Sequence, residues 1–199
     1  MHPIPLPPLF APPPADVPLA TVPLAGDGSP PYVMYIQPFT DVQNAAEVKK
    51  LLMAGDPRVP EMTLVDASNI LDIFQLQLAC TKALLSQRDN TMTTRTLYAE
   101  ILFNLCPTNK ISEAFRKFGI ADTSTAVLAV MVGQQPPSAE IQNMLATLIK
   151  GTPVGVDSVP GLADVKAVNK IFKLGSGQRT RNETLSLVIG TMALKGIMS

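Results

Sequence analysis

The stretch Thr94–Ile120, TRTLYAEILFNLCPTNKISEAFRKFGI, predicts two amphipathic helices joined by a tight Pro–Thr–Asn turn. In the first helix Leu97, Ile101 and Leu105 recur every four residues and form one apolar stripe. In the second helix the spacing i, i+3, i+4, i+7 is filled without a gap by Ile111, Ala114, Phe115 and Phe118. The pattern therefore predicts a helical pair whose common apolar face belongs to the core.

The polar residues of this segment define the ends of the second helix and a basic face. Asn109 suits an N-cap, and Gly119 suits the position after the last helical residue. The face opposite the apolar stripe carries cations, two of them in the last turn where the helix dipole favours them: Arg95, Lys110, Arg116 and Lys117. No catalytic group is placed for chemistry, so the segment is typical of a binding module.

The composition is that of one domain with little charge. A length of 199 residues with 46% apolar content is enough for a sizeable core. The formal net charge is zero and only 16% of the residues are charged, so any nucleic-acid contact has to rest on a local patch. The low charge and nine methionines indicate apolar surface covered by a partner, with an unusually large core as the alternative.

The cysteines and the absence of a long apolar run indicate which cellular environment fits the sequence. Cys80 and Cys106 lie among helical apolar residues, which favours buried free thiols over a disulfide or a metal pair and fits a reducing environment. The sequence has no apolar run of about 18 residues, and its N-terminus lacks the features of a signal peptide. We therefore expect no membrane association.

Prolines dominate the N-terminus, where eleven of the nineteen fall within the first 31 residues. Proline fixes φ and lacks a backbone donor, so this stretch cannot form a helix or a central strand. We expect residues 1–22 to be a mobile Pro-rich tail and residues 23–199 to form a single domain. An inert extension is the preferred interpretation of the tail, with a ligand for an SH3- or WW-type domain at Pro5–Pro8 as the alternative.

The remaining pattern predicts a mixture of strands and helices. Asp41 and Asp66 are expected to cap helices, and the Gly/Pro-rich residues 151–161 are expected to form a loop. Strands are expected at 32–36, 62–65 and 126–132, and further helices at 41–55, 66–87, 138–151, 163–174 and 183–198. Because the order is not strict βαβ alternation, we predict an α+β fold in which a small, largely antiparallel sheet packs against a helical bundle.

Candidate catalytic groups are few. The single histidine, His2, falls in the expected tail, so no Ser–His or Cys–His pair can be assembled. The Gly175–Gly177 segment lacks the other residues of a P-loop or a dinucleotide fingerprint. Glu100 and Asn104 lie one turn apart, but glycosidase-type chemistry needs two carboxylates, so solvation or an interface contact is preferred. The sequence predicts no enzyme, no cofactor and no metal site.

A second group of cations follows Asp164, with no acidic residue before Glu183. Its members are Lys166, Lys170, Lys173, Arg179 and Arg181. Cation clusters are usually solvated faces, and neither group has aromatic residues interleaved for stacking on bases. Any nucleic-acid contact is therefore expected to involve phosphates or shape, not base readout.

With LVDASNIL (Leu64–Leu71) before it and VKAVNKIFKL (Val165–Leu174) after it, the helical-pair segment resembles the small-subunit family of the KEOPS/EKC complex. The resemblance runs from about Tyr32 to the C-terminus. Two departures are visible, a longer Pro-rich N-terminus and Cys106 at a position where a serine is expected. Neither changes the helical pattern. The family's mixed sheet-plus-bundle fold agrees with the predicted class.

The resemblance implies a non-catalytic subunit that directly binds the PRPK-type atypical kinase/ATPase, regulates it, and meets the other KEOPS/EKC subunits through it. The complex makes threonylcarbamoyl-adenosine beside the anticodon of tRNA, and archaeal relatives are understood to hold the 3′ CCA end, which makes tRNA a candidate partner. Linked roles in telomere maintenance and transcription, and a location in the nucleus and cytoplasm, are also implied. A stand-alone RNA-binding or adaptor protein outside KEOPS and a small-molecule enzyme remain the alternatives.

Two sets of contact residues follow from this resemblance. The apolar residues of the C-terminal helix exceed what one narrow core stripe needs, so we predict a kinase interface at Leu185, Val188, Ile189 and Met192. The cations of the helical pair are the predicted tRNA contacts, namely Arg95, Lys110, Arg116 and Lys117.

Overall fold

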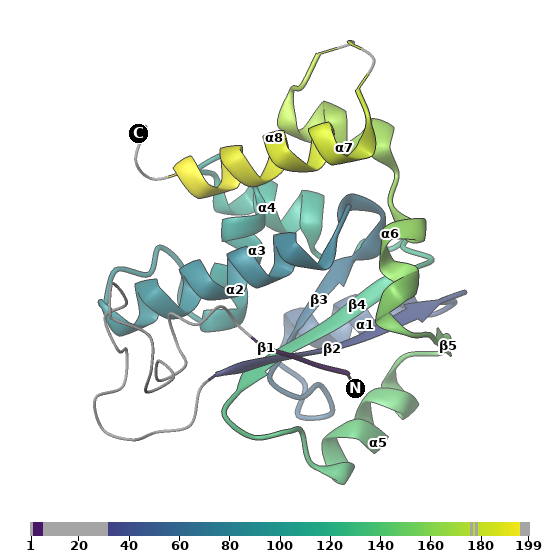
Figure 1. Cartoon of the computed structure of the whole chain (residues 1–199). Helices are drawn as coiled ribbons and strands as arrows, with labels where there is room; N and C mark the ends of the chain where they lie inside the picture. Colours follow the sequence, from purple (N-terminus) through teal and green to yellow (C-terminus); the bar gives the residue numbers. More distant parts are fainter. Residues whose placement is uncertain (1, 6–31, 176, 178, 196–199) are drawn as a thin grey trace, which may run out of the picture.

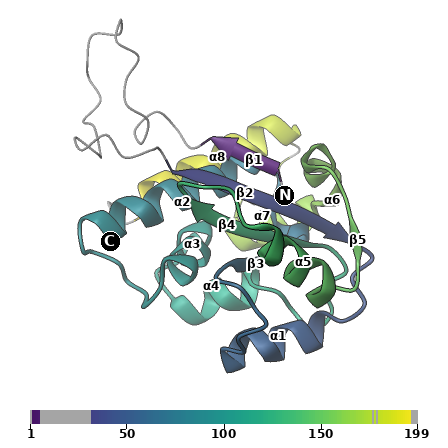
Figure 2. The same cartoon turned by 90° about the horizontal axis from the view of Figure 1, so that it is seen from below.

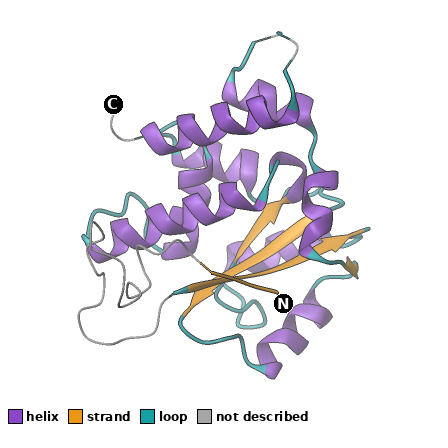
Figure 3. Ribbon diagram, in the orientation of Figure 1, coloured by secondary structure: helices purple, strands orange, loops and turns teal. Residues whose placement is uncertain are grey.

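One β-sheet with helices on both faces organises the chain (Figures 1 and 3). The computed structural model describes residues 2–5, 32–175, 177 and 179–195. The sheet has the strand order β1-β2-β4-β3, β5 pairs with the end of β2, and all pairings are antiparallel. Its strands are β1 (His2–Pro5), β2 (Val33–Thr40), β3 (Thr63–Asp66), β4 (Val127–Gly133) and β5 (Thr152–Pro153).

The pairing of β2 with β4 sets which side chains face each side of the sheet. Met34 lies opposite Val132 and Ile36 opposite Val130 in the antiparallel register. Because side chains alternate along a strand, these residues belong to one face and their chain neighbours to the other. Both faces of the pair are apolar, so both have to be covered.

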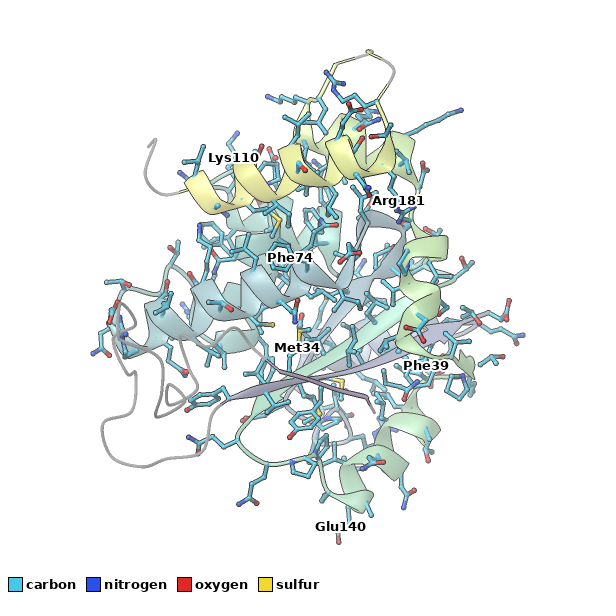
Figure 4. The ribbon with its side chains drawn as sticks, viewed as in Figure 1. Met34, Phe39, Phe74, Lys110, Glu140 and Arg181 are labelled. Atoms are coloured by element: carbon cyan, nitrogen blue, oxygen red, sulfur yellow. The ribbon has the colours of Figure 1, made fainter. Side chains whose placement is uncertain are left out.

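A helical bundle covers the first face, on which Met34 and Ile36 lie; Figure 1 shows it above the sheet. Helix α2 packs against the sheet and contacts both α3 and α8. The side chain of Met34, labelled in Figure 4, is fully buried below α2. The bundle consists of α2 (Ile73–Arg88), α3 (Leu97–Leu105), α4 (Ile111–Phe118), α7 (Val165–Phe172) and α8 (Arg181–Leu194).

Helices α1 (Ala45–Ala54) and α5 (Ala139–Leu148) cover the other face and form a second apolar cluster with it. This cluster includes Phe39, Val48 and Leu145. The predicted class, an α+β fold with a small antiparallel sheet against a helical bundle, is confirmed. The helical layer on the second face is the addition that the sequence pattern did not predict.

Strand β1 corrects the expectation for the first residues of the tail. Residues 2–5 pair with Val33–Ile36 of β2 at the edge of the sheet, as Figure 2 shows from below. Pro3 and Pro5 are two residues apart, so their missing donors fall on the same side of the strand, and an edge strand can turn that side away from its partner. The rest of the expected tail, residues 6–22, lies outside the described residues, and the division at residue 22 stays a prediction.

Two helices begin later than predicted. Asp41 has a left-handed backbone with φ of 53°, and α1 starts only after Asn44. Asp66 caps a short 3-10 helix, Ala67–Asn69, and the chain then becomes extended. Helix α2 starts anew with Asp72, whose side chain forms a capping box with Gln75. In both cases the α-helix therefore begins several residues after the N-cap that the sequence predicted.

The stretch expected to be a loop contains structure. Residues 151–161 include β5, the 3-10 helix Val156–Ser158 and most of the one-turn helix α6 (Val159–Leu162). Val159 is fully buried and belongs to the core of the bundle. The prediction of a loop was wrong because short elements held by tertiary contacts leave no periodic pattern.

The helical pair of Thr94–Ile120 is confirmed as α3 and α4, but its details differ. Lys110 occupies the N-cap position of α4 in place of Asn109, with no side-chain capping bond. Gly119 has an extended backbone, φ −71° and ψ 161°, and not the left-handed one that a C′ glycine usually has. A Cβ at Gly119 would lie 2.6 Å from the carbonyl oxygen of Phe115. A glycine is therefore needed at this position because of the close contact with Phe115, and not because the backbone is left-handed.

We therefore predict that Gly119→Ala destabilises the protein by about 1–3 kcal/mol, because the backbone has to shift to relieve the contact. Gly190→Ala is the matched control, since it lies within α8 and a Cβ added there would meet no atom within 4 Å. This control should raise the free energy of unfolding by about 0.5–1 kcal/mol. Urea denaturation measures both, and equal effects would contradict the packing argument.

Candidate functional site on the helical bundle

Helix α8 is held at both ends by cations. At its start, the Arg181 guanidinium donates to the carbonyls of Leu71 and Pro160, each at 2.6 Å. Figure 4 shows Arg181 at this end of the helix, toward α6. At the other end, the Lys82 ammonium donates to the carbonyls of Met192 at 2.7 Å and Lys195 at 2.9 Å. These contacts place α8 alongside α2 and fix the face that it presents to solvent.

The predicted kinase interface on α8 divides into two groups. Val188 and Met192 are fully buried in the core of this chain, so the prediction that they contact a partner is wrong. Leu185 and Ile189 are half-buried, and their role stays a prediction. Sequence periodicity could not separate the groups because α8 carries apolar residues on more than one side.

The exposed apolar residues of α8 are ones that sequence analysis missed. Leu187 and Leu194 are 44% and 49% exposed. Seven residues apart, they lie on the same side of the helix. We call this pair the α8 surface. Large exposed leucines on a helix whose ends are both fixed offer a rigid apolar contact.

Three of the four predicted tRNA contacts lie on α4, where one carboxylate partly neutralises them. The Lys117 ammonium is 2.9 Å from the Glu113 carboxylate, and that of Lys110 is 3.9 Å away. The hydrogen bond from Lys117 is the main reason that the pKa of Glu113 is lowered. Arg116 is exposed on the same helix. The local positive charge is therefore smaller than the number of cations in the sequence suggests.

The fourth predicted contact, Arg95, belongs to a different segment from the others. It precedes Thr96, the N-cap of α3, whereas α4 begins beyond the far end of that helix. Arg95 is exposed in the segment before α3. Lys110, Arg116 and Lys117 thus belong to α4 and its N-cap, whereas Arg95 comes from the segment before α3.

Two residues of α4 that were predicted to be core are exposed. Ile111 and Phe115 are 39% and 44% exposed, whereas Ala114 and Phe118 are fully buried. The Phe118 ring packs edge-on against Phe172 with 6.2 Å between the ring centroids. A short outer helix buries only one of its two apolar rows, which explains the error. An aromatic ring therefore does lie among the cations, contrary to expectation; we call Lys110, Ile111, Phe115, Arg116 and Lys117 the α4 surface.

The members of the second cation group have different roles in the structure. Arg181 is committed to the two carbonyls at the start of α8. Lys166, Lys170 and Lys173 are exposed on α7 or directly after it. This group retains three exposed lysines on α7 or directly after it, and Arg179 is exposed before α8.

Solvation or an interface contact was expected for Glu100 and Asn104, but both residues are buried within the chain. The Glu100 carboxylate accepts hydrogen bonds from the backbone N–H and the hydroxyl of Thr94, both at 2.7 Å. Both residues line a cleft of about 370 Å³ that also includes Lys82 and Lys195. An open cleft with these two buried polar residues in its wall was not visible from residue spacing.

The potential metal ligands and the two cysteines are placed as follows in the described part of the chain. Among the described residues, no three His, Cys, Asp or Glu side chains are gathered as they would be to hold a metal ion. Cys80 and Cys106 are buried free thiols, as predicted, and burial raises the pKa of Cys80. None of the helices in the described part of the chain is long and apolar enough to span a bilayer.

Comparison with known proteins gives consistent matches over most of the chain. Residues 39–196 match the family model described as kinase binding protein CGI-121. The zebrafish (Danio rerio) EKC/KEOPS complex subunit TPRKB is 35% identical over 159 residues, which cover 80% of this chain and 89% of that protein. The EKC/KEOPS complex subunit cgi121 of Aspergillus fumigatus is 32% identical over 171 residues, covering 82% and 89%.

The division of α8 into buried and exposed residues predicts different effects of two adjacent substitutions. Val188→Ala should lower the free energy of unfolding by about 2 kcal/mol, because it removes buried methyl groups and leaves a cavity. Leu187→Ala should change it by less than about 0.5 kcal/mol, because the side chain is already half in water. Chemical denaturation tests both, and a larger loss for Leu187→Ala would contradict the assignment.

Proposed function

The chain belongs to the kinase binding protein CGI-121 family, and from this premise we propose that it is a non-catalytic subunit of the EKC/KEOPS complex that binds the PRPK-type kinase directly. The observation that carries the proposal is the family match, which covers almost all of the described fold, including the complete helical bundle. Two relatives that share most of their length with this chain are named as subunits of that complex.

The α8 surface is the part of the bundle best suited to the kinase. Leu187 and Leu194 are large and exposed, and interface cores are built from such apolar side chains surrounded by polar ones. The contacts of Arg181 and Lys82 fix the helix before any partner arrives, so little conformational entropy is lost on binding. This surface replaces the buried Val188 and Met192 as the expected contact.

We predict that the double variant Leu187→Asp/Leu194→Asp loses at least about tenfold in affinity for the kinase, because two carboxylates would have to be desolvated at the interface. Met53→Asp is the control, since Met53 is 79% exposed on α1, across the sheet from the bundle. Calorimetry with the purified kinase measures both affinities.

The variants must retain the unfolding free energy of the wild type for the comparison to be valid. Undiminished binding by the double variant would place the interface elsewhere on the protein. Failure of the wild-type chain to bind the kinase would favour the alternative, a stand-alone RNA-binding or adaptor protein outside KEOPS.

The proposal extends to support of tRNA threonylcarbamoyl-adenosine modification, with the α4 surface contacting the single-stranded 3′ end of the tRNA. Lys110, Arg116 and Lys117 supply positive charge for phosphates. The exposed ring of Phe115 supplies the stacking platform that single-stranded nucleic acids commonly use. The zero net charge of the chain argues for modest affinity without the rest of the complex.

We predict that Lys110→Ala/Arg116→Ala/Lys117→Ala weakens tRNA binding and flattens its salt dependence, by roughly 0.7 in log K per log salt for each phosphate that is no longer neutralised. Glu113→Gln should act in the opposite direction, because it frees the two lysines that Glu113 now neutralises. Fluorescence anisotropy at several salt concentrations, with intact tRNA and with tRNA lacking its CCA end, measures these effects.

The matched control is Lys166→Ala/Lys170→Ala/Lys173→Ala, which removes the same charge from the second cation group. If this control weakens binding while the α4 variant does not, the tRNA is bound at α7. If neither triple variant changes the affinity or the salt slope, direct tRNA binding by this subunit is wrong.

A further inference from the structure

The cleft beside the C-terminal end of α8 has a polar lining that neither proposed surface uses. It has a volume of about 370 Å³ and lies between α2, α3, the segment after α2 and the end of α8. Its residues are Lys82, Ser86, Thr91, Thr93, Glu100, Phe103, Asn104, Asn109 and Lys195. The volume is about that of a dozen water molecules, so it can accept a small organic ion.

Asn104 is the first sign that this cleft takes a ligand. The residue is 5% exposed, and its Nδ2 has no hydrogen-bond partner among the described residues. Buried amide donors are nearly always paired, and leaving one unpaired lowers stability. The Nδ2 atom itself has almost no solvent-accessible surface, so an acceptor from outside the chain reaches it only after the Asn104 side chain turns toward the cleft.

Lys195 is the second sign. Its ammonium lies 3.4 Å from the centroid of the Phe103 ring and donates to the Phe103 carbonyl. Within the described part of the chain it makes no ion pair, and two of its three N–H groups are left for other acceptors. The cleft therefore holds a half-buried ammonium that has no direct ion pair within the described part of the chain.

The other charged groups of the lining determine which ligand charge the cleft favours. The three N–H groups of Lys82 donate to the carbonyls of Met192, Ala193 and Lys195, so Lys82 contributes charge but no free donor. The Glu100 carboxylate is held by Thr94. Two ammonium groups and one carboxylate leave one net positive charge, which suits a monoanion.

We propose that this cleft binds a small oxyanion, a carboxylate or a phosphate monoester, through the Lys195 ammonium and the Asn104 amide. Both groups are donors without a matching acceptor, and hydrogen bonds from an ammonium to an oxyanion are among the stronger ones in proteins. The ring of Phe103 adds apolar surface to the wall of the cleft, and the hydroxyls of Thr91 and Thr93 add polar surface. No lining residue belongs to the α8 surface or the α4 surface, so failure of the kinase and tRNA tests would leave this proposal intact.

The protonation of Lys195 gives the binding a pH dependence. Burial lowers the pKa of Lys195 to about 8; the neighbouring Lys82 acts in the same direction, while Cys106 and Glu100 oppose it. Carboxylates keep their charge throughout this range. Binding of a carboxylate should therefore be strongest well below pH 8 and decline as the pH rises through the pKa of Lys195.

The test is a titration of the ¹⁵N-labelled full-length chain with acetate and, separately, with methyl phosphate, at constant ionic strength maintained with sodium chloride. We expect a saturable shift of the Asn104 side-chain amide signals in the magnetic resonance spectrum. Lys195→Gln should weaken the binding by about tenfold or more, since it removes a charge-assisted hydrogen bond. Lys173→Gln, which removes the same charge from an exposed position after α7, should leave it unchanged.

Lys195→Arg keeps a positive charge at this position at every pH and so tests whether the pH dependence of binding comes from the protonation of Lys195. Arginine stays protonated at all accessible pH values, so this variant should bind at about pH 7 and still bind at about pH 9.5, where the wild type has lost most of its affinity. Asn104→Leu should weaken binding without lowering the free energy of unfolding, because it removes an unpaired donor. A response to only one of the two anions identifies the ligand as a carboxylate or a phosphate. No saturable shift with either, or equal binding by Lys195→Gln and the wild type, would overturn the proposal.

Discussion

The pairing of β2 with β4 is the constraint on which the rest of the molecule depends. The first four residues of β4, Val127–Val130, are fully buried, and they lie opposite Ile36–Phe39 of β2. Alternation along the strands sends apolar side chains to both faces, so one helical layer cannot cover them. The bundle of α2, α3, α4, α7 and α8 and the smaller layer of α1 and α5 are the two consequences.

Helices that cover a sheet have an inner face committed to the core, and function is left to their outer faces. In α8 the inner face holds Val188 and Met192, and the outer one holds Leu187 and Leu194. In α4 the same division buries Phe118 and exposes Phe115. The family relationship indicates what kind of partner to look for, and the division of each helix indicates which side chains can reach it.

Many polar residues near the bundle hold helices in place. Their charges are therefore less available to partners than the sequence suggests. Arg181 and Lys82 belong to the cations of the chain, yet both are directed to backbone carbonyls at the ends of α8. Glu113 neutralises two lysines that a sum of charges treats as free. Lys195 and Asn104 differ from these, because each keeps donors that nothing in the described chain satisfies.

The sequence by itself determined the fold class, most of the helices and the family resemblance, because apolar periodicity and caps are local properties of the chain. It also predicted the helical pair of Thr94–Ile120 and a buried strand at 126–132, which the structure places at Val127–Gly133. Only the tertiary structure decided that Ile111 and Phe115 are exposed, that Val188 and Met192 are core, and that Glu100 and Asn104 line a cleft. The physical reason is that periodicity shows which face of a helix is apolar, whereas burial depends on which neighbours pack against that face.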